Sequence, residues 1–313
     1  MTLSSPVDAG ASTRSGYVPA EAVSESAYDR LRRWALGAAW SLKPPRHHGV
    51  VPAMAMLARH WLSGGKGSAV LPDPEAALDK PDGLAGICGP LDVAMLVEAY
   101  RRGLFPWCHI EPLKWWAPAQ RMVLRLENFD MEKNLRRRLR NGHFRVTFDR
   151  DVQAVMQGCA EARAGRWHLT WITPQIRRLF GDMFDAGYVH SVEVWDEAGE
   201  LAGGLYGVAV GNVFFTESQF TRQRDASKVG FATLNAHLQD WGFVLNDGKH
   251  HTAHLAHMGF ALMPRPEFSA ILSGQAHQPD RIGRWSVDAT LDVGNWNPAS
   301  GSVPRRQAAP ASS

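Results

Sequence analysis

A carboxylate interrupts an apolar run in the second half of the chain. The segment GVAVGNVFFTESQF, residues 207–220, has the valine and phenylalanine content of a strand, yet Glu217 lies within it. A charged residue inside a sheet is unfavourable unless it is paired or used in chemistry. Glu217 is therefore either an edge-strand residue paired with Arg222 or a functional carboxylate.

A second carboxylate ends another predicted strand. Asp247 closes the short run FVLND, residues 243–247, and Lys249 follows two residues later. A carboxylate in this position is commonly a cap or turn residue, and it can also orient a reacting group. Both roles are open for Asp247.

Cations gather in two segments. A predicted helix over residues 131–140 contains Lys133, Arg136, Arg137, Arg138 and Arg140. The loop before a second predicted helix contains Arg222, Arg224 and Lys228. Arg136 and Arg140 are four residues apart and share a helix face. Helix N-termini accept anions, and Asp225 is placed to be the N-cap of the second helix. Cationic runs such as these two commonly lie on solvent-exposed faces. The alternative is that their side chains contact phosphate groups.

Composition excludes several broad classes. The chain has 313 residues, 45% of them hydrophobic, so it can bury a large core. Its net charge of +3 is too small for the whole surface to attract a polyanion, so a local patch would be needed. Cys88, Cys108 and Cys159 form no CxxC motif and are expected as reduced thiols. The N-terminus lacks a signal-peptide core, and no apolar run reaches the ~20 residues that span a bilayer. We expect a soluble cytoplasmic protein.

Helices and strands must position these groups. Helical spacing predicts helices at residues 27–40, 50–61, 91–102, 149–163, 174–186 and 226–241. Runs of β-type residues predict strands at residues 122–126, 144–148, 190–195, 201–210, 213–220 and 243–247. This mixture indicates an α/β or α+β layer fold. Residues 1–20 and the final PRRQAAPASS are expected to lack fixed structure.

Ordered motifs over residues 70–272 resemble leucyl/phenylalanyl-tRNA–protein transferases. They are LPDPEAALDKPDGLAGICGPLDVAMLVEAYRRGLFPW, WWAPAQRMVL, TWIT, HSVEVWDEAGELAGGLYGVAVG, the TES and ASK segment, and LNDGKHHTAHLAHMG. The resemblance implies a small N-terminal α/β domain, residues 70–148, and a GNAT-like acyltransferase domain, residues 149–272. An N-terminal extension, residues 1–69, and a C-terminal tail, residues 273–313, fall outside it.

The resemblance implies an aminoacyltransferase. It would move Leu, Phe or a similar amino acid from aminoacyl-tRNA to the α-amino group of proteins that begin with Arg or Lys, which marks them for N-end rule degradation. The donor is an activated ester, so no cofactor or metal is expected, and holding the reactants in attack geometry supplies much of the rate. The attacking α-amine has a pKa of about 7.7–8 and loses its proton readily.

The resemblance also assigns residues to the site. Glu217, Asp247 and Lys249 stand at its catalytic positions, where Glu217 and Asp247 would hold the cationic N-terminus of the acceptor protein and its amine. Its substrate-binding positions hold Tyr100, Trp107, Trp171, Leu205, Thr216 and Gln219. The basic residues expected to bind the acceptor end of tRNA are Lys133, Arg136, Arg137, Arg140, Arg222 and Lys228.

Three of these positions depart from the family pattern. Lys249 replaces a glutamine whose carbonyl accepts a hydrogen bond, which a charged lysine cannot do. It could neutralise Asp247, repel a cationic substrate, or act as a base if its pKa were depressed. Thr216 and Gln219 replace Gly and Met, and an unpaired polar group in the pocket would cost about 1–3 kcal/mol. We therefore expect a shifted or weakened choice of amino acid, with a bulge near these residues if they share a pocket.

Other functions stay open. One is a non-catalytic relative that binds tRNA or protein N-termini, and another is an acyltransferase with a different donor. Gly230 and Ala232 fit part of the coenzyme A loop of acetyltransferases, but residue 227 is serine, which disfavours that donor. His250, His254 and His257 have metal-ligand spacing on a helix, but packing or surface positions are the favoured interpretation.

Overall fold

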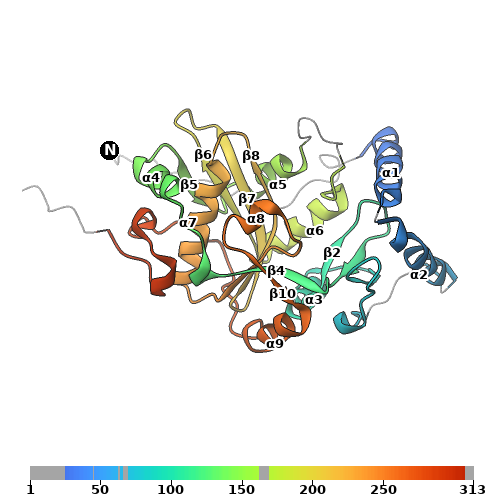
Figure 1. Ribbon diagram of the computed structural model, residues 1–313. Helices are drawn as coiled ribbons and strands as arrows, with labels where there is room; N and C mark the ends of the chain where they lie inside the picture. The colour runs from blue at the N-terminus through green and yellow to red at the C-terminus, as the bar shows by residue number, and fades with distance from the viewer. Residues whose placement is uncertain (1–24, 45, 63, 66–69, 162–168, 307–313) are drawn as a thin grey trace, which may run out of the picture.

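Two β-sheets of unequal size organise the chain (Figure 1). A computed structural model describes residues 25–44, 46–62, 64–65, 70–161 and 169–306. One sheet has three strands in the order β1-β3-β2, and the other has seven in the order β10-β4-β9-β8-β7-β6-β5. The expected α/β fold, with a small N-terminal domain before a larger one, is confirmed.

The small sheet is antiparallel and is formed by β1 (Leu84–Ile87), β2 (Phe105–Trp107) and β3 (Lys114–Trp116). Helix α3 (Val93–Arg101) precedes β2. Asp92 caps α3 by accepting a hydrogen bond from Met95 N at 2.7 Å. Gly103, at φ 75°, then takes the left-handed conformation that turns the chain into β2. This turn places the end of α3 beside the start of β2.

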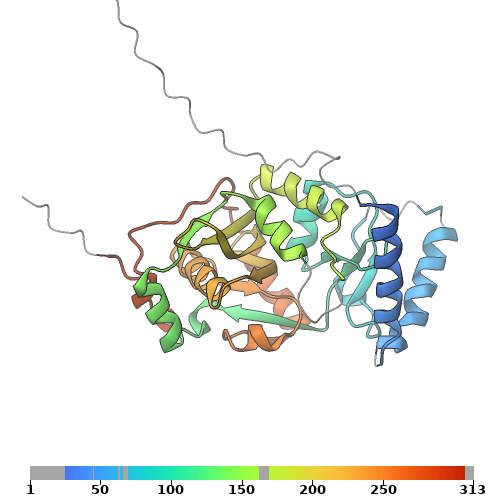
Figure 2. The same ribbon diagram turned by 90° about the horizontal axis from the view of Figure 1, so that it is seen from above.

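Two N-terminal helices lie beside the small sheet at one end of the molecule (Figures 1 and 2). They are α1 (Ala27–Leu42) and α2 (Val50–Leu62), as the helical spacing predicted. Arg33 anchors α1, because its Nη1 donates to His109 O at 2.9 Å and its Nη2 pairs with Glu111 at 3.2 Å. The expectation for residues 1–20 lies outside the described residues.

The large sheet contains one parallel pair. Its strands are β4 (Gln120–Arg125), β5 (Arg145–Phe148), β6 (Val189–Trp195), β7 (Leu201–Val210), β8 (Val213–Thr221), β9 (Leu245–Asp247) and β10 (Ala261–Pro264). Strands β8 and β9 pair parallel, and the other neighbours pair antiparallel. Phe215 pairs with Asp247, the last residue of β9, so β8 continues past the end of its neighbour. Residues from Thr216 onward therefore lie next to the loop that follows β9.

Helices cover both faces of this sheet. Helix α7 (Ala226–Asp240) covers one face, and α3, α5 (Val152–Ala160) and α6 (Pro174–Asp185) cover the other. The apolar stripe in the sequence of α7, formed by Val229, Leu234, Leu238 and Trp241, predicts one buried side, and this prediction is wrong because nearly every residue from Ala226 to Leu238 is buried. The outer side of α7 is covered by α4 and by the C-terminal segment.

The C-terminal segment adds to the core. After α8 (Ala253–Ala256) and α9 (Arg265–Gln275), the chain continues with little regular structure, and Trp285 and Trp296 are buried at 5% and 0% exposure. Arg305 pairs with Asp240 at 3.0 Å, so the expectation of a loose end is wrong at this residue. Residues 307–313 lie outside the described part of the chain.

The expected boundary at residue 148 divides strands that pair together. Strands β4 and β5 precede that position, yet both belong to the seven-stranded sheet. The small sheet ends with β3 at Trp116. Strand pairing therefore favours a boundary between β3 and β4.

Candidate active site

A β-bulge in β8 presents Glu217. Gly207 of β7 pairs with Thr216, and Tyr206 pairs with Ser218, which leaves Glu217 as the extra residue. Strand β8 is an inner strand between β7 and β9, and Glu217 lies two residues beyond its last pair with β9, Phe215 with Asp247. Its side chain is 1% exposed. The irregularity expected in this stretch is therefore confirmed, and it places Glu217 itself out of register.

Glu217 is held by a tyrosine and a lysine. Tyr100 Oη and Lys249 Nζ each donate to Glu217 Oε1 at 2.6 Å. Lys249 Nζ also donates to Thr216 O at 2.9 Å. Burial, followed by the charge of Glu217, raises the pKa of Tyr100 well above its usual value, so the hydroxyl stays protonated and donates.

Asp247 is neutralised by Arg121, which lies in the motif WWAPAQRMVL but was not among the expected site residues. The side chains of Arg121 and Asp247 are 1% and 0% exposed. Arg121 donates to both carboxylate oxygens of Asp247, with Nε to Oδ1 at 3.3 Å, and its Nη1 donates to Gly103 O at 2.7 Å. The sequence of β4, QRMVLR, contains a signal for this ion pair, because a buried cation inside an apolar strand requires a partner.

Lys249 links the two carboxylates. Its backbone N donates to Asp247 Oδ1 at 2.8 Å, while its ammonium bonds Glu217. One expected alternative was that the side chain of Lys249 neutralises Asp247. It does not, because Arg121 pairs with that carboxylate. We call Tyr100, Arg121, Glu217, Asp247 and Lys249 the paired-charge cluster. Its two carboxylates are balanced by two cations.

Aromatic rings border the cations of this cluster. The centre of the Phe105 ring lies 5.4 Å from Lys249 Nζ and 5.1 Å from Arg121 Cζ. Lys249 is the most exposed charged side chain of the cluster, at 7%. It also has φ 65°, in the left-handed region that non-glycine residues rarely adopt. Lys249 is therefore the least buried charged group of the cluster, although it too is buried.

The side chains expected to surround the aminoacyl group lie on both faces of the large sheet. Leu205 packs on the α7 face, and Gln219 pairs directly opposite it. Thr216 Oγ1 donates to Asn246 Oδ1 at 2.8 Å, and Asn246 in turn donates to a side chain of α7. Trp171 packs against the core of the opposite face. These four residues therefore do not line one pocket in this arrangement, and the Thr216 hydroxyl is hydrogen-bonded, contrary to the unpaired group considered from the sequence.

Two other expected aromatic residues meet in the small sheet. The Trp107 and Trp116 ring centres are 5.5 Å apart, and Trp116 Nε1 donates to Trp107 O at 2.8 Å. Both are partly exposed. Trp107 is two residues after Phe105 on β2, so the two side chains share a face of the strand. Aromatic side chains therefore continue from Phe105, which is buried near Lys249, to the partly exposed Trp107.

Helix α4 (Lys133–Asn141) uses one of its basic faces to hold the C-terminal segment. Arg136 and Arg140 share a face, as their spacing predicts. Arg136 Nη1 donates to Trp296 O at 2.5 Å, and Arg140 Nε donates to Gly294 O at 3.3 Å. The structure therefore gives these two cations a packing role.

Another face of α4 borders a polar hollow of about 230 Å³. Its lining includes Arg137, Arg138 and Arg224. Arg138 and Arg224 belong to the two basic runs for which phosphate contact was considered, although the resemblance did not assign them to tRNA binding. Asp225 is at the N-cap position of α7, but its side chain makes no capping hydrogen bond and lies 3.7 Å from Arg138. Lys133 is exposed on the same helix.

The remaining two predicted tRNA-binding cations pair with glutamates. Arg222 Nη2 lies 2.7 Å from Glu161, and Lys228 Nζ lies 3.2 Å from Glu132. Arg222 therefore does not pair with Glu217, which was the structural alternative considered for that carboxylate. These residues do not belong to the paired-charge cluster.

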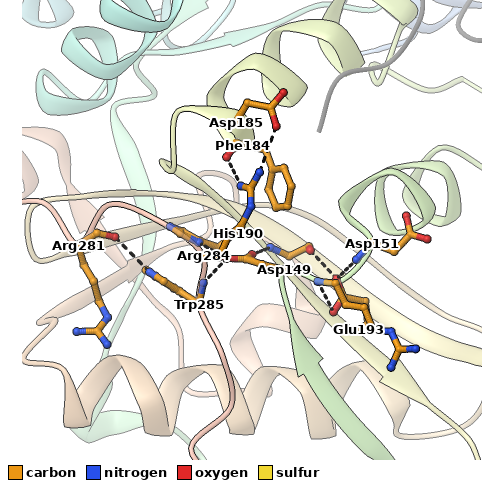
Figure 3. A network of polar contacts seen from close by, with 11 residues as sticks. Asp149, Asp151, Phe184, Asp185, His190, Glu193, Arg281, Arg284 and Trp285 are labelled. Carbon is orange, nitrogen blue, oxygen red and sulfur yellow. Dashed lines mark hydrogen bonds and ion pairs between the residues drawn. The ribbon is translucent and has the colours of Figure 1, made fainter. Parts of the chain in front are cut away.

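A second group of buried carboxylates docks the C-terminal segment (Figure 3). Asp149 Oδ2 accepts hydrogen bonds from Trp285 N at 2.6 Å and from His190 Nδ1 at 2.8 Å, while its Oδ1 accepts one from Ser191 N at 2.8 Å. The rings of His190 and Trp285 stack 3.5 Å apart. Burial lowers the pKa of His190. A neutral imidazole with its proton on Nδ1 fits these contacts.

Glu193 extends this group toward α5. Its side chain accepts hydrogen bonds from Thr147 Oγ1 at 2.6 Å, Ser191 Oγ at 2.5 Å and Asp151 N at 3.1 Å. Burial raises its pKa. We call Asp149, His190, Ser191, Glu193 and Trp285 the tail-docking cluster.

Two further features concern only the described ranges of the chain. None of their helices is long and apolar enough to cross a bilayer. The same residues contain no group of three or more His, Cys, Asp or Glu side chains placed to hold a metal ion. Cys88, Cys108 and Cys159 are buried and form no disulfide.

Two models of known protein families match this chain, one in the part with the small sheet and one in the part with the large sheet. The model described as "Leucyl/phenylalanyl-tRNA protein transferase N-terminal domain" matches residues 89–119. The model described as "Leucyl/phenylalanyl-tRNA protein transferase" matches residues 123–273. The interval between the matches coincides with the boundary that strand pairing favours. Helices α1 and α2, and the segment from residue 274, lie outside both matches.

Individual relatives agree with the family models. A leucyl/phenylalanyl-tRNA–protein transferase of Thiobacillus denitrificans is 43% identical over 223 residues, covering 71% of this chain and 97% of that protein. Proteins of the same name from Aromatoleum aromaticum and Azotobacter vinelandii are 43% and 46% identical, covering 74% and 66% of this chain and 97% and 90% of their own lengths.

Proposed function

Because this chain belongs to the leucyl/phenylalanyl-tRNA–protein transferase family, we propose that it transfers Leu or Phe from aminoacyl-tRNA to the α-amino group of proteins beginning with Arg or Lys. The α-amino nitrogen forms a bond to the ester carbonyl carbon. The bond from that carbon to the ribose oxygen breaks, and the proton lost by the amine passes to that oxygen. The product is a protein one residue longer, which suits it for N-end rule degradation in the cytoplasm.

The observation that carries this proposal is the convergence of Glu217, Asp247 and Lys249 at the end of β9. These residues come from β8, from β9 and from the loop after it, and all stand at the catalytic positions of the resemblance. Hydrogen bonds join them through Lys249. No metal or cofactor enters the proposed reaction, because the ester already activates the acyl group.

The proposed roles follow from exposure and pairing. Lys249 meets the substrate, and its ammonium stabilises the negative charge that develops on the carbonyl oxygen. Glu217 and Tyr100 hold that ammonium in place. Asp247 is a positioning residue, because its carboxylate joins Arg121 to the backbone of Lys249. This arrangement replaces our expectation that Glu217 and Asp247 themselves bind the acceptor, since each already has a cation.

The proposed tRNA surface lies on α4. Arg137, Arg138 and Arg224 border one hollow, and contact with backbone phosphates of the acceptor stem is the proposed role of these cations. Lys133 extends the same helix face toward solvent. Arg136 and Arg140, also expected in this role, bond the C-terminal segment, and Arg222 and Lys228 pair with glutamates away from this hollow. Arg138 and Arg224 lie 3.7 and 3.8 Å from Asp225, which borders the same hollow.

Single-turnover transfer tests the function directly. Purified protein is mixed with Leu-tRNA or Phe-tRNA and a peptide that begins with Arg. We expect a peptide extended by one residue, detected by mass. A peptide with the same sequence and an acetylated N-terminus is the control, because it lacks the nucleophile. Failure to extend the free peptide with either tRNA would overturn the proposal.

A further inference from the structure

The aromatic surface of the small sheet continues onto the N-terminal extension. Trp40, in the last turn of α1, has its ring centre 6.0 Å from that of Trp107 and 5.0 Å from that of His109. The Trp107 and His109 rings are 4.5 Å apart, and Trp116 lies against Trp107. We call Trp40, Trp107, His109 and Trp116 the aromatic wall. Trp40 lies outside the residues matched by the family models.

A cation lies over the ring of Trp40. Arg46 Cζ is 4.2 Å from the ring centre, and Arg46 is exposed, as is Lys43. Burial, followed by the charges of Arg33 and Arg46, lowers the pKa of His109 to about 4, so its ring is neutral near pH 7. The wall therefore combines neutral ring surfaces with exposed positive charge.

Docking of α1 has anchors other than Trp40. Arg33 is 6% exposed and pairs with Glu25 at 2.9 Å as well as with Glu111. Gly37, one turn later, allows a close approach, since a Cβ there would lie 2.6 Å from the Ile110 side chain. A replacement of Trp40 should therefore leave α1 in place and change chiefly the surface that it presents.

We propose that Trp40 and Arg46 extend the binding surface for the single-stranded 3′ end of the aminoacyl-tRNA. Aromatic faces bind bases with little sequence preference, and a guanidinium beside them binds phosphate. Phe105 connects this wall to Lys249 along β2. A protein acceptor that begins with Arg or Lys would be repelled by Arg46, so a nucleic-acid strand fits the charge better. The inference rests on the proposed function.

The test compares two tryptophans of the same helix. Trp40→Leu removes the ring of the wall, and Trp34→Leu removes a ring that is 45% exposed elsewhere on α1. Binding is measured by fluorescence anisotropy with intact tRNA and with tRNA that lacks its single-stranded 3′ nucleotides. We expect Trp40→Leu to raise the Kd for intact tRNA by roughly fivefold to 100-fold, which corresponds to one lost base stack. Trp34→Leu should match the natural protein.

Further variants distinguish a role of Trp40 in binding tRNA from a role in packing α1. Trp40→Phe should recover most of the affinity, because it restores a ring. In transfer assays, Trp40→Leu should raise the KM for aminoacyl-tRNA and leave the KM for the acceptor peptide unchanged. Arg46→Gln should reduce the slope of log K against log salt by about 0.7, the loss of one phosphate contact on a single strand.

Two results would overturn the inference while the proposed function stands. The first is active transfer with equal tRNA affinity in Trp40→Leu and Trp34→Leu. The second is an equal loss of affinity for intact and shortened tRNA in Trp40→Leu, which would indicate altered packing. Absence of transfer by the natural protein would instead contradict the proposed function, and the binding series would still test whether the aromatic wall contacts the 3′ end.

Discussion

Two groups of buried carboxylates lie on the same seven-stranded sheet and are stabilised in opposite ways. In the paired-charge cluster, Glu217 and Asp247 each meet a cation. In the tail-docking cluster, the hydrogen bonds described for Asp149 and Glu193 come from backbone amides, hydroxyls and an imidazole (Figure 3). One cluster therefore concentrates charge of both signs, and the other keeps its carboxylates among neutral donors.

The paired-charge cluster therefore positions charged groups for chemistry, whereas the tail-docking cluster positions side chains for packing. The paired-charge cluster joins α3, β4, β8, β9 and the loop after β9, and its residues lie within the family matches except Arg121, which lies in the interval between them. The tail-docking cluster holds Trp285, which lies beyond them. An ammonium fixed by a carboxylate can stabilise developing negative charge, whereas neutral hydrogen bonds mainly satisfy buried polar groups.

The largest expected effect distinguishes the two clusters by activity. Glu217→Gln removes the counter-charge that holds Lys249, so single-turnover transfer should slow by about 100-fold or more. Glu193→Gln is the matched change in the tail-docking cluster, and the folded fraction of that variant should transfer at the natural rate. Equal rates for the two variants would remove the functional distinction between the clusters.

The next effect is on stability. Asp247→Asn leaves the buried guanidinium of Arg121 without its counter-charge, so the free energy of unfolding should fall by about 3–5 kcal/mol. Asp149→Asn disturbs hydrogen bonds to neutral donors and should lower it by about 1–3 kcal/mol. Urea denaturation measures both. A larger loss for Asp149→Asn would reverse our ranking of the two clusters.

A smaller effect concerns the donors of Lys249. Lys249→Gln keeps an N–H group within the cluster, whereas Lys249→Met keeps similar length with no donor. We expect Lys249→Met to transfer about tenfold more slowly than Lys249→Gln, a difference of about 1.4 kcal/mol in the barrier. Identical single-turnover rates would show that donation from this position does not matter.

The smallest effect is a pH dependence of stability. Because burial lowers the folded-state pKa of His190, the unfolded chain binds the proton more readily. The free energy of unfolding should therefore fall as the pH drops below about 6.5, the ordinary histidine value. His190→Phe should flatten this slope, while Lys249→Gln should retain it. Urea titrations across this pH range would contradict us if His190→Phe kept the full slope.

The fold was largely predictable because local patterns report directly on it. The observed ranges of helix α6 and of the hairpin strands β6 and β7 are close to the predicted ones. The spacing of apolar residues and the turn residues that define these elements are local signals. The burial of α7 was not predictable in this way. Its outer side is covered by the C-terminal segment, which has little periodicity of its own.

The candidate site was only partly predictable for a related reason. Motifs identified Glu217, Asp247 and Lys249, but pairing depends on which strands become neighbours. Strand β4 lies beside β9, which brings Arg121 to Asp247 across 126 residues of sequence. Alternation alone would also separate Thr216 from Gln219, and the bulge at Glu217 places both on the α7 face.

The most direct measurement is a structure of the protein with a non-hydrolysable, amide-linked phenylalanyl-adenosine, which mimics the charged 3′ end of tRNA. We expect the carbonyl oxygen of the amide within hydrogen-bonding distance of Lys249 Nζ, with the Glu217 contact to Lys249 retained. An analogue bound with its carbonyl remote from Lys249, in a protein that is active in transfer, would contradict the assignment of the paired-charge cluster as the active site.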